Sequence, residues 1–320
     1  MAGRSKRHQQ TMISSDTLFG IFLTIQTGVG FIGNALLFTF YMYIFLILPH
    51  QKKPADGILA HLTLANALTL IFRCMPHIIF SFGIRPALDD IGCKIVLYVQ
   101  RVTRGISLNA TSLQSTFQAV TIAPHSCKWS WLKKKISALI HPSLLFFWVM
   151  NMVMYSYFMV NIVARGNVTH ATCGYYTQIC RVMSCDHQGV VISVSAIFIQ
   201  DLFFLFLMAW NSVYMMTVLS RHHKTAQHVR SRTSSSRSSP EHKATHIVLI
   251  LVCCFVFCHW SNIFLLMYTE LIGTRSWQLE NINNFISSFY PTIVPFILIK
   301  NENRISGMNF ISTRSRVFSP

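Results

Sequence analysis

Charged residues are scarce in this sequence. They make up 12% of its 320 residues, about half the share that a soluble domain carries. Hydrophobic residues account for 52%, and apolar runs of about twenty residues recur along the whole chain. One large soluble core does not fit such runs, whereas membrane-spanning helices do. The composition therefore predicts an all-α membrane protein embedded in the lipid bilayer.

Several signatures of other protein classes are also missing. No nucleophile–base pair, phosphate-binding loop or zinc-ligand spacing is present, so we expect no enzyme, no metal site and no cofactor. There is no internal repeat and no polar stripe through several spans, which argues against a transporter or channel. The net charge of +17 comes from short segments between the apolar runs, a layout that does not predict nucleic-acid binding.

Seven apolar runs fit membrane-spanning helices. They cover residues 18–45, 57–82, 91–123, 137–163, 190–219, 245–268 and 281–299. Before the sixth run, Ser239 and Pro240 form a typical helix start, as N-cap and first-turn proline. The sequence thus predicts a seven-transmembrane helical bundle at 18–300, between an N-terminal arm (1–17) and a C-terminal tail (301–320).

Lysine and arginine counts orient the predicted bundle. The first, third and fifth connections and the tail hold sixteen of these residues, whereas the opposite side holds eight. The positive-inside rule places the richer side in the cytoplasm and the N-terminus outside. We therefore expect a multi-pass plasma-membrane protein with an extracellular N-terminal arm and a cytoplasmic tail.

Two features of the predicted outer face agree with this orientation. The tripeptide "NVT" that starts at Asn167, between the fourth and fifth spans, is an N-glycosylation acceptor. Cysteines also gather there: Cys93 opens the third span, and Cys173, Cys180 and Cys185 lie in the following outer loop. A disulfide among these cysteines suits an oxidising compartment. We predict both a glycan at Asn167 and an outer disulfide.

Seven helices with the N-terminus outside and an outer cystine at the third span describe a G-protein-coupled receptor. The motifs depart from the large rhodopsin-like family, however. "GNALL" keeps that family's asparagine at Asn34, but Asn66 replaces an aspartate and Gln118 replaces the arginine of an acidic-Arg-aromatic triplet. Because Gln118 carries no charge, the usual ionic latch cannot operate. We therefore predict a different lock for the inactive state.

These departures match another group of receptors. The segments "HLTLANAL", "LDDIGCK", "YVQRVTRGISL", "STFQAVTIAP", "SRHHKTAQHV", "SSPEHKATHIVLIL" and "YPTIVPFIL" together resemble vomeronasal type-1 receptors. The resemblance implies a receptor that binds pheromones or other small semiochemicals in the outer half of the bundle. It also implies signalling through an inhibitory-class heterotrimeric G protein. Bitter-taste receptors, a chemosensory alternative, lack the Arg-Val-x-Arg-Gly segment found here.

The resemblance further implies a cystine between the third span and the second outer loop. Cys93 matches the first partner. For the second partner, the interval to Asp201 in the fifth span favours Cys180, and Cys173 is the alternative.

Charged side chains within spans are the candidates for ligand contact. At about 1.5 Å per residue, Arg101 and Arg104 lie about 12 Å and about 16 Å below Cys93. Each would cost ~2.5–3.5 kcal/mol at the membrane centre, so such groups face a partner or a cavity. Two interpretations remain open. The arginines pair with Asp201 and close the bundle, or they contact a ligand, with Arg104 facing the pocket and Asp201 as its counter-charge.

Overall fold

The structure is a computed structural model. It describes residues 2–84, 88–123, 127–160, 162–164, 175–176, 180–182, 187–230, 240–272 and 277–301. Within these residues there are seven α-helices, as predicted: α1 (Ala2–Leu46), α2 (Asp56–Ser81), α3 (Asp90–Ile122), α4 (Cys127–Val160), α5 (His187–Arg230), α6 (Pro240–Ile272) and α7 (Trp277–Asn301). A short 3-10 helix (Pro49–Gln51) joins α1 to α2, and three short strands follow α4.

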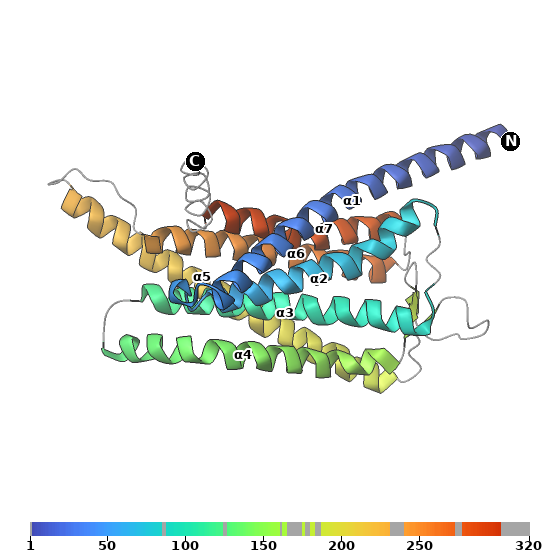
Figure 1. Cartoon of the computed structure of the whole chain (residues 1–320). Coiled ribbons are helices and arrows are strands. Elements are labelled where there is room, and N and C mark those ends of the chain that lie inside the picture. Colours follow the sequence, from blue (N-terminus) through green and yellow to red (C-terminus); the bar gives the residue numbers. More distant parts are fainter. Residues whose placement is uncertain are drawn as a thin grey trace, which may run out of the picture.

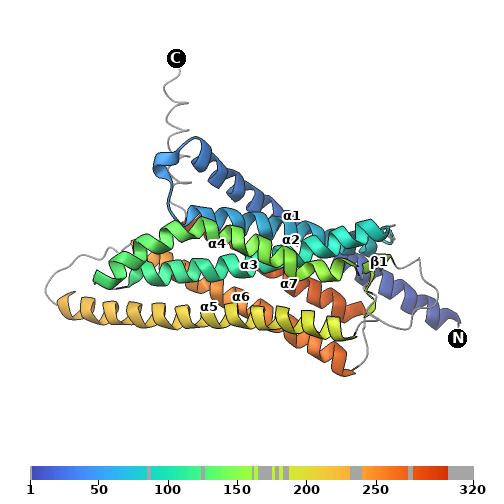
Figure 2. The same ribbon diagram turned by 90° about the horizontal axis from the view of Figure 1, so that it is seen from below.

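The helices lie lengthwise side by side, and α3 runs through the middle of the bundle (Figures 1 and 2). It contacts α2, α4, α5 and α6. Many of its buried side chains are polar: Thr103, Ser107, Asn109, Thr111, Ser112, Gln114, Ser115 and Gln118. Lipid cannot satisfy such groups, so a helix of this composition is stable only where other helices surround it.

Six of the described helices contain a stretch long and apolar enough to cross a membrane, and α3 is not among them. Its charged and polar residues lower its hydropathy, although at 33 residues it is long enough to span. An apolar core occupies the bundle interior, and every helix contributes to it. Its members include Leu37, Leu62, Leu108, Ile140, Met208, Leu251 and Val294.

Most helix ends lie close to the ends of the predicted spans, but some helices extend beyond the residues predicted to lie in the membrane. Pro240 begins α6, in the first-turn position that the sequence indicates. The N-terminal arm continues α1, and α5 runs on to Arg230, so both helices extend beyond the predicted spans. The predicted end of the fourth span at residue 163 is wrong: α4 ends at Val160, and Ile162–Ala164 is a strand.

The three strands form a small antiparallel sheet at one end of the bundle. They are β1 (Ile162–Ala164), β2 (Tyr175–Tyr176) and β3 (Cys180–Val182), in the order β1-β3-β2. This end also carries the N-terminus (Figure 1) and is called the outer end below, because the charge pattern predicts it to be extracellular. Pairing with β3 holds Ile162–Ala164 in extended backbone, which accounts for the end of α4 at Val160.

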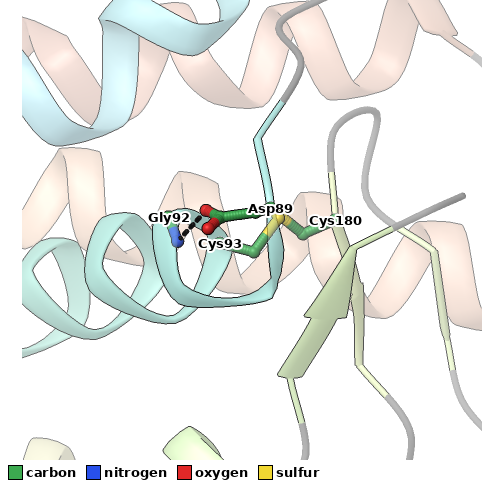
Figure 3. Close-up of a disulfide and its surroundings, with 4 residues drawn as sticks. All are labelled: Asp89, Gly92, Cys93 and Cys180. Carbon is green, nitrogen blue, oxygen red and sulfur yellow. Dashed lines mark hydrogen bonds between the residues drawn. A yellow bond between two sulfur atoms is a disulfide. The ribbon is translucent and has the colours of Figure 1, made fainter. Parts of the chain in front are cut away.

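A disulfide joins this sheet to the start of α3. Cys93 and Cys180 are bonded and both are fully buried, in the pairing that the family resemblance favours (Figure 3). Beside them, the Asp89 carboxylate accepts a hydrogen bond from the Gly92 amide at 2.8 Å and caps the helix. The outer end of α3 is thereby fixed. Asn167 and the alternative partner Cys173 lie outside the described residues.

The contact between α1 and α7 explains the "GNALL" and "YPTIVPFIL" segments. Pro295 has no amide hydrogen, so it cannot donate to the Pro291 carbonyl one turn earlier. The fully buried Asn34 side chain supplies that donor, with its Nδ2 2.7 Å from the Pro291 oxygen. Gly33 permits the approach, because a Cβ there would lie 2.9 Å from the Pro295 ring.

Candidate functional site

An ion pair joins α3 to α5 in the interior of the bundle. Arg104 donates a hydrogen bond through Nη2 to Oδ2 of Asp201. The Asp201 side chain is only 9% exposed, whereas that of Arg104 is 39% exposed. The structure therefore brings together these two predicted residues. The acid is enclosed, and the arginine is still reachable from the space beside it.

A histidine on α6 approaches the same carboxylate. Nε2 of His259 lies 3.8 Å from Oδ2 of Asp201, and the side chain is 5% exposed. Among the described residues, this nitrogen has no hydrogen-bond partner. Sequence reasoning missed His259, although the rule that singled out Asp201 applies to it, since it is an ionisable residue within an apolar run.

Arg104 lines a cavity of about 50 Å³ between α2, α3, α6 and α7. The polar residues around this cavity, called the central cavity below, are Asn66, Thr69, Arg73, Arg104, Ser107, His259, Asn262 and Ser287. Asp201 and Arg101 are not among its described lining residues. Pockets for small-molecule ligands measure ~300–1,000 Å³. The central cavity has room for one or two waters and must widen before it can hold such a ligand.

The lining of the central cavity has hydrogen-bond donors to spare. Nδ2 of Asn66 and Nε of Arg73 are buried and have no partner among the described residues. The other Asn66 atom, Oδ1, accepts a hydrogen bond from Ser107 at 2.8 Å. Arg104 adds further N–H groups, because a guanidinium carries five and Asp201 is the one acceptor residue that Arg104 has among the described residues. These donors favour a ligand that carries hydrogen-bond acceptor oxygens.

Arg101 lies one turn nearer the outer end than Arg104. It is half-buried, and both arginines interact electrostatically with the Tyr155 hydroxyl on α4, Arg104 more strongly than Arg101. The two arginines of the "RVTRG" segment therefore share Tyr155 as a neighbour, and Arg104 in addition lines the central cavity and pairs with Asp201.

A chain of ring contacts leads from His259 toward α7. The His259 ring stacks on Phe255 with 5.9 Å between centroids, and Phe255 meets Tyr290 edge-on at 4.7 Å. The Tyr290 hydroxyl is in turn hydrogen-bonded to Thr111 of α3 at 2.8 Å. The floor of the central cavity thus connects three helices through close packing.

Neutral hydrogen bonds hold the cytoplasmic part of α3. Gln118 donates through Nε2 to Oγ1 of Thr245 on α6 at 3.2 Å, and both residues are buried. Asn211 on α5 donates to Oγ1 of Thr116 at 2.8 Å. At the position where the sequence excludes an ionic latch, the structure has an uncharged contact between α3 and α6.

The comparisons with known proteins decide what kind of protein carries this site. A model of the vomeronasal organ pheromone receptor family matches residues 17–311. The chain belongs to this family. It is 32% identical to vomeronasal type-1 receptor 1 of Gorilla gorilla gorilla, over 93% of this chain and 84% of that protein. It is 30% identical to olfactory receptor class A-like protein 1 of Danio rerio, over 93% of each.

The fold of this vomeronasal-family receptor is that of a G-protein-coupled receptor. Squid rhodopsin superposes with a TM-score of 0.67 at 14% identity, covering 92% of this chain and 84% of that one. Family and fold together make the protein a chemosensory G-protein-coupled receptor of the plasma membrane, with a small-molecule ligand and a G protein as its partners. It is a signalling receptor and not an enzyme, and the taste-receptor and transporter alternatives are set aside.

Proposed function

We propose that this receptor binds a pheromone or another small semiochemical in the outer half of its bundle and activates an inhibitory-class heterotrimeric G protein. The family description, a vomeronasal organ pheromone receptor, supports the stimulus class. The observation that carries the proposal is the position of Arg104. Its guanidinium is held by Asp201 and is at the same time accessible from the central cavity.

In this proposal Arg104 contacts the ligand directly, and Asp201 positions Arg104. Surplus donors on Arg104, Arg73 and Asn66 support a ligand that presents a carbonyl or an anionic group to them. An acceptor brought into this enclosed site forms charge-assisted hydrogen bonds, which are about twice as strong as neutral ones. Because the central cavity is too small for such a ligand, the helices around it must move as the ligand enters.

Signalling would take place at the cytoplasmic end. The end of α5, the start of α6 and the connection between them are basic, with six lysines and arginines from Arg221 to Lys243, and suit an acidic protein surface. The α3–α6 contact at Gln118 and Thr245 lies toward the same end. Separation of these two helices would open a docking surface for the G protein.

Guanine-nucleotide exchange in membranes tests this function. Receptor membranes of confirmed surface density are combined with purified inhibitory-, stimulatory- and Gq-class G proteins and with fractions of animal secretions. We expect one or more fractions to stimulate exchange on the inhibitory class alone, with no response in mock membranes. Stimulation confined to another class would contradict the proposed coupling, and silence from every fraction would contradict the proposed stimulus class.

A further inference from the structure

We propose that Asp201 changes partner during activation: a ligand acceptor takes Arg104 from it, and the freed carboxylate pairs with His259 and draws α6 toward α5. This inference rests on the proposed function for the arrival of the ligand. The partner exchange itself is a property of three residues of this chain and can be tested without the ligand.

Two N–H groups compete for a single atom. Nη2 of Arg104 and Nε2 of His259 both approach Oδ2 of Asp201, the first within hydrogen-bonding distance and the second at 3.8 Å. An N–H···O hydrogen bond spans about 2.7–3.2 Å, so His259 is about 1 Å too far away. In the described part of the chain, Arg104 and His259 are the two side chains of basic residue type within 4.0 Å of the Asp201 carboxylate.

Because Asp201 is buried, its carboxylate is driven to pair with His259 once a ligand binds Arg104. The Asp201 carboxylate is 9% exposed, and a buried charge that loses its partner is strongly destabilised. Arg104 is the more accessible member of the pair and the one that lines the central cavity, so a ligand meets it first. The enclosed His259, whose Nε2 has no other partner among the described residues, is then the group that can satisfy the carboxylate.

A movement of about 1 Å at His259 is large enough to matter at the other end of α6. Phe255, packed edge-on against Tyr290, lies one turn below His259 and provides a pivot. At about 1.5 Å per residue, His259 is about 6 Å from the pivot and Thr245 is about 15 Å from it. A rigid helix therefore converts about 1 Å at His259 into about 2.5 Å at Thr245, enough to break its hydrogen bond to Gln118.

The experiment imitates the ligand by removing the guanidinium. Arg104→Gln removes the positive charge and shortens the side chain, which weakens its hold on Asp201, and we expect basal nucleotide exchange to rise about five-fold, the population change of one lost hydrogen bond. Adding His259→Phe should return basal exchange to the wild-type level. Adding His259→Gln, which keeps an N–H donor near the position of Nε2, should preserve the rise. Trp260→Phe, at an exposed neighbour on α6, is the matched control and leaves the rise intact.

A second readout separates this inference from the proposed coupling. Bioorthogonal spin labels are placed at the exposed Lys135 of α4 and His246 of α6 in purified, nanodisc-embedded receptor, and the distance between them is measured without G protein. The distance should change in Arg104→Gln and revert in the double variant with His259→Phe. If it does so while exchange stays flat on every G protein, the partner exchange holds and the proposed coupling fails.

Equal distances and equal exchange in Arg104→Gln with and without His259→Phe would overturn the partner exchange. Arg104→Met is used in parallel, at matched surface density, so that poor folding of one variant does not decide the result.

Discussion

Gly105 of α3 lies so close to Asn151 of α4 that a Cβ at residue 105 would sit 1.9 Å from the Asn151 Oδ1 atom. Asn151 cannot move aside easily. It is fully buried, and its Nδ2 donates to Oδ1 of Asn109 and to the Phe147 carbonyl at 2.9 Å and 2.8 Å. The glycine of the "RVTRG" segment is therefore required by the close approach of two helices, one residue away from Arg104.

Gly105→Ala should reduce the surface level of the receptor strongly, because overpacking of a close helix contact costs about 1–3 kcal/mol or more. Surface labelling and flow cytometry measure this. Gly28→Ala is the matched control, since a Cβ at residue 28 meets no atom within 4 Å. Adding Asn151→Ala should restore part of the lost expression. Normal expression of Gly105→Ala would show that the contact is looser than described.

The cystine between Cys93 and Cys180 closes a loop across 87 residues. Cross-links of such length stabilise by about 4–5 kcal/mol in the chain-entropy account. We expect Cys93→Ser and Cys180→Ser to lose surface receptor equally, and the double variant to lose no more than either one. Cys173→Ser should leave the surface level unchanged. If Cys173→Ser and Cys93→Ser gave the same loss, the alternative pairing would hold instead.

The hydrogen bond from Gln118 to Thr245 is expected to restrain basal signalling. Thr245→Val removes the acceptor and keeps the side-chain volume, and a net hydrogen bond is worth about 0.5–1.5 kcal/mol. Basal nucleotide exchange should therefore rise by about two-fold to about twelve-fold. The comparison variant is Thr121→Val, whose hydroxyl donates to the Phe117 carbonyl of α3 and to no other described residue. A wild-type basal rate in Thr245→Val would exclude this contact as the inactive-state lock.

A glycan at Asn167 remains a prediction of the sequence and a direct test of orientation. Endoglycosidase treatment should lower the apparent mass of the wild type and leave that of Asn167→Gln unchanged. Asn109 begins the same type of tripeptide but is fully buried within α3, so Asn109→Gln should not alter the mass shift. A treated wild type with no shift would count against glycosylation at Asn167.

Much of the fold follows from the sequence, for physical reasons. Membrane thickness sets the length of apolar runs, so the number and approximate limits of the helices are readable. The pairing of an arginine in α3 with Asp201 is also readable, because a charge within a span needs a partner. Which arginine pairs with Asp201 could not be predicted, since Arg101 and Arg104 are one turn apart and the choice depends on how α5 is rotated against α3.

Features that depend on how each helix is rotated about its axis could not be predicted from the sequence. The central cavity, the approach of His259 to Asp201 and the contact between Gln118 and Thr245 each join residues from different helices. No local pattern encodes these rotations. The strand at Ile162–Ala164 was missed for another reason: its extended form depends on pairing with β3, which the disulfide to Cys93 holds in place.

The ligand potency of Arg104 variants tests the central claim most directly. Dose–response curves of nucleotide exchange, using the most active secretion fraction, are compared for wild type, Arg104→Gln and Arg101→Gln at equal surface density. If Arg104 binds the ligand, its loss should shift the half-maximal dose at least about ten-fold, the equivalent of one charged hydrogen bond. Arg101→Gln removes the same charge outside the central cavity and should shift it far less. Full potency in Arg104→Gln would contradict ligand contact at this site.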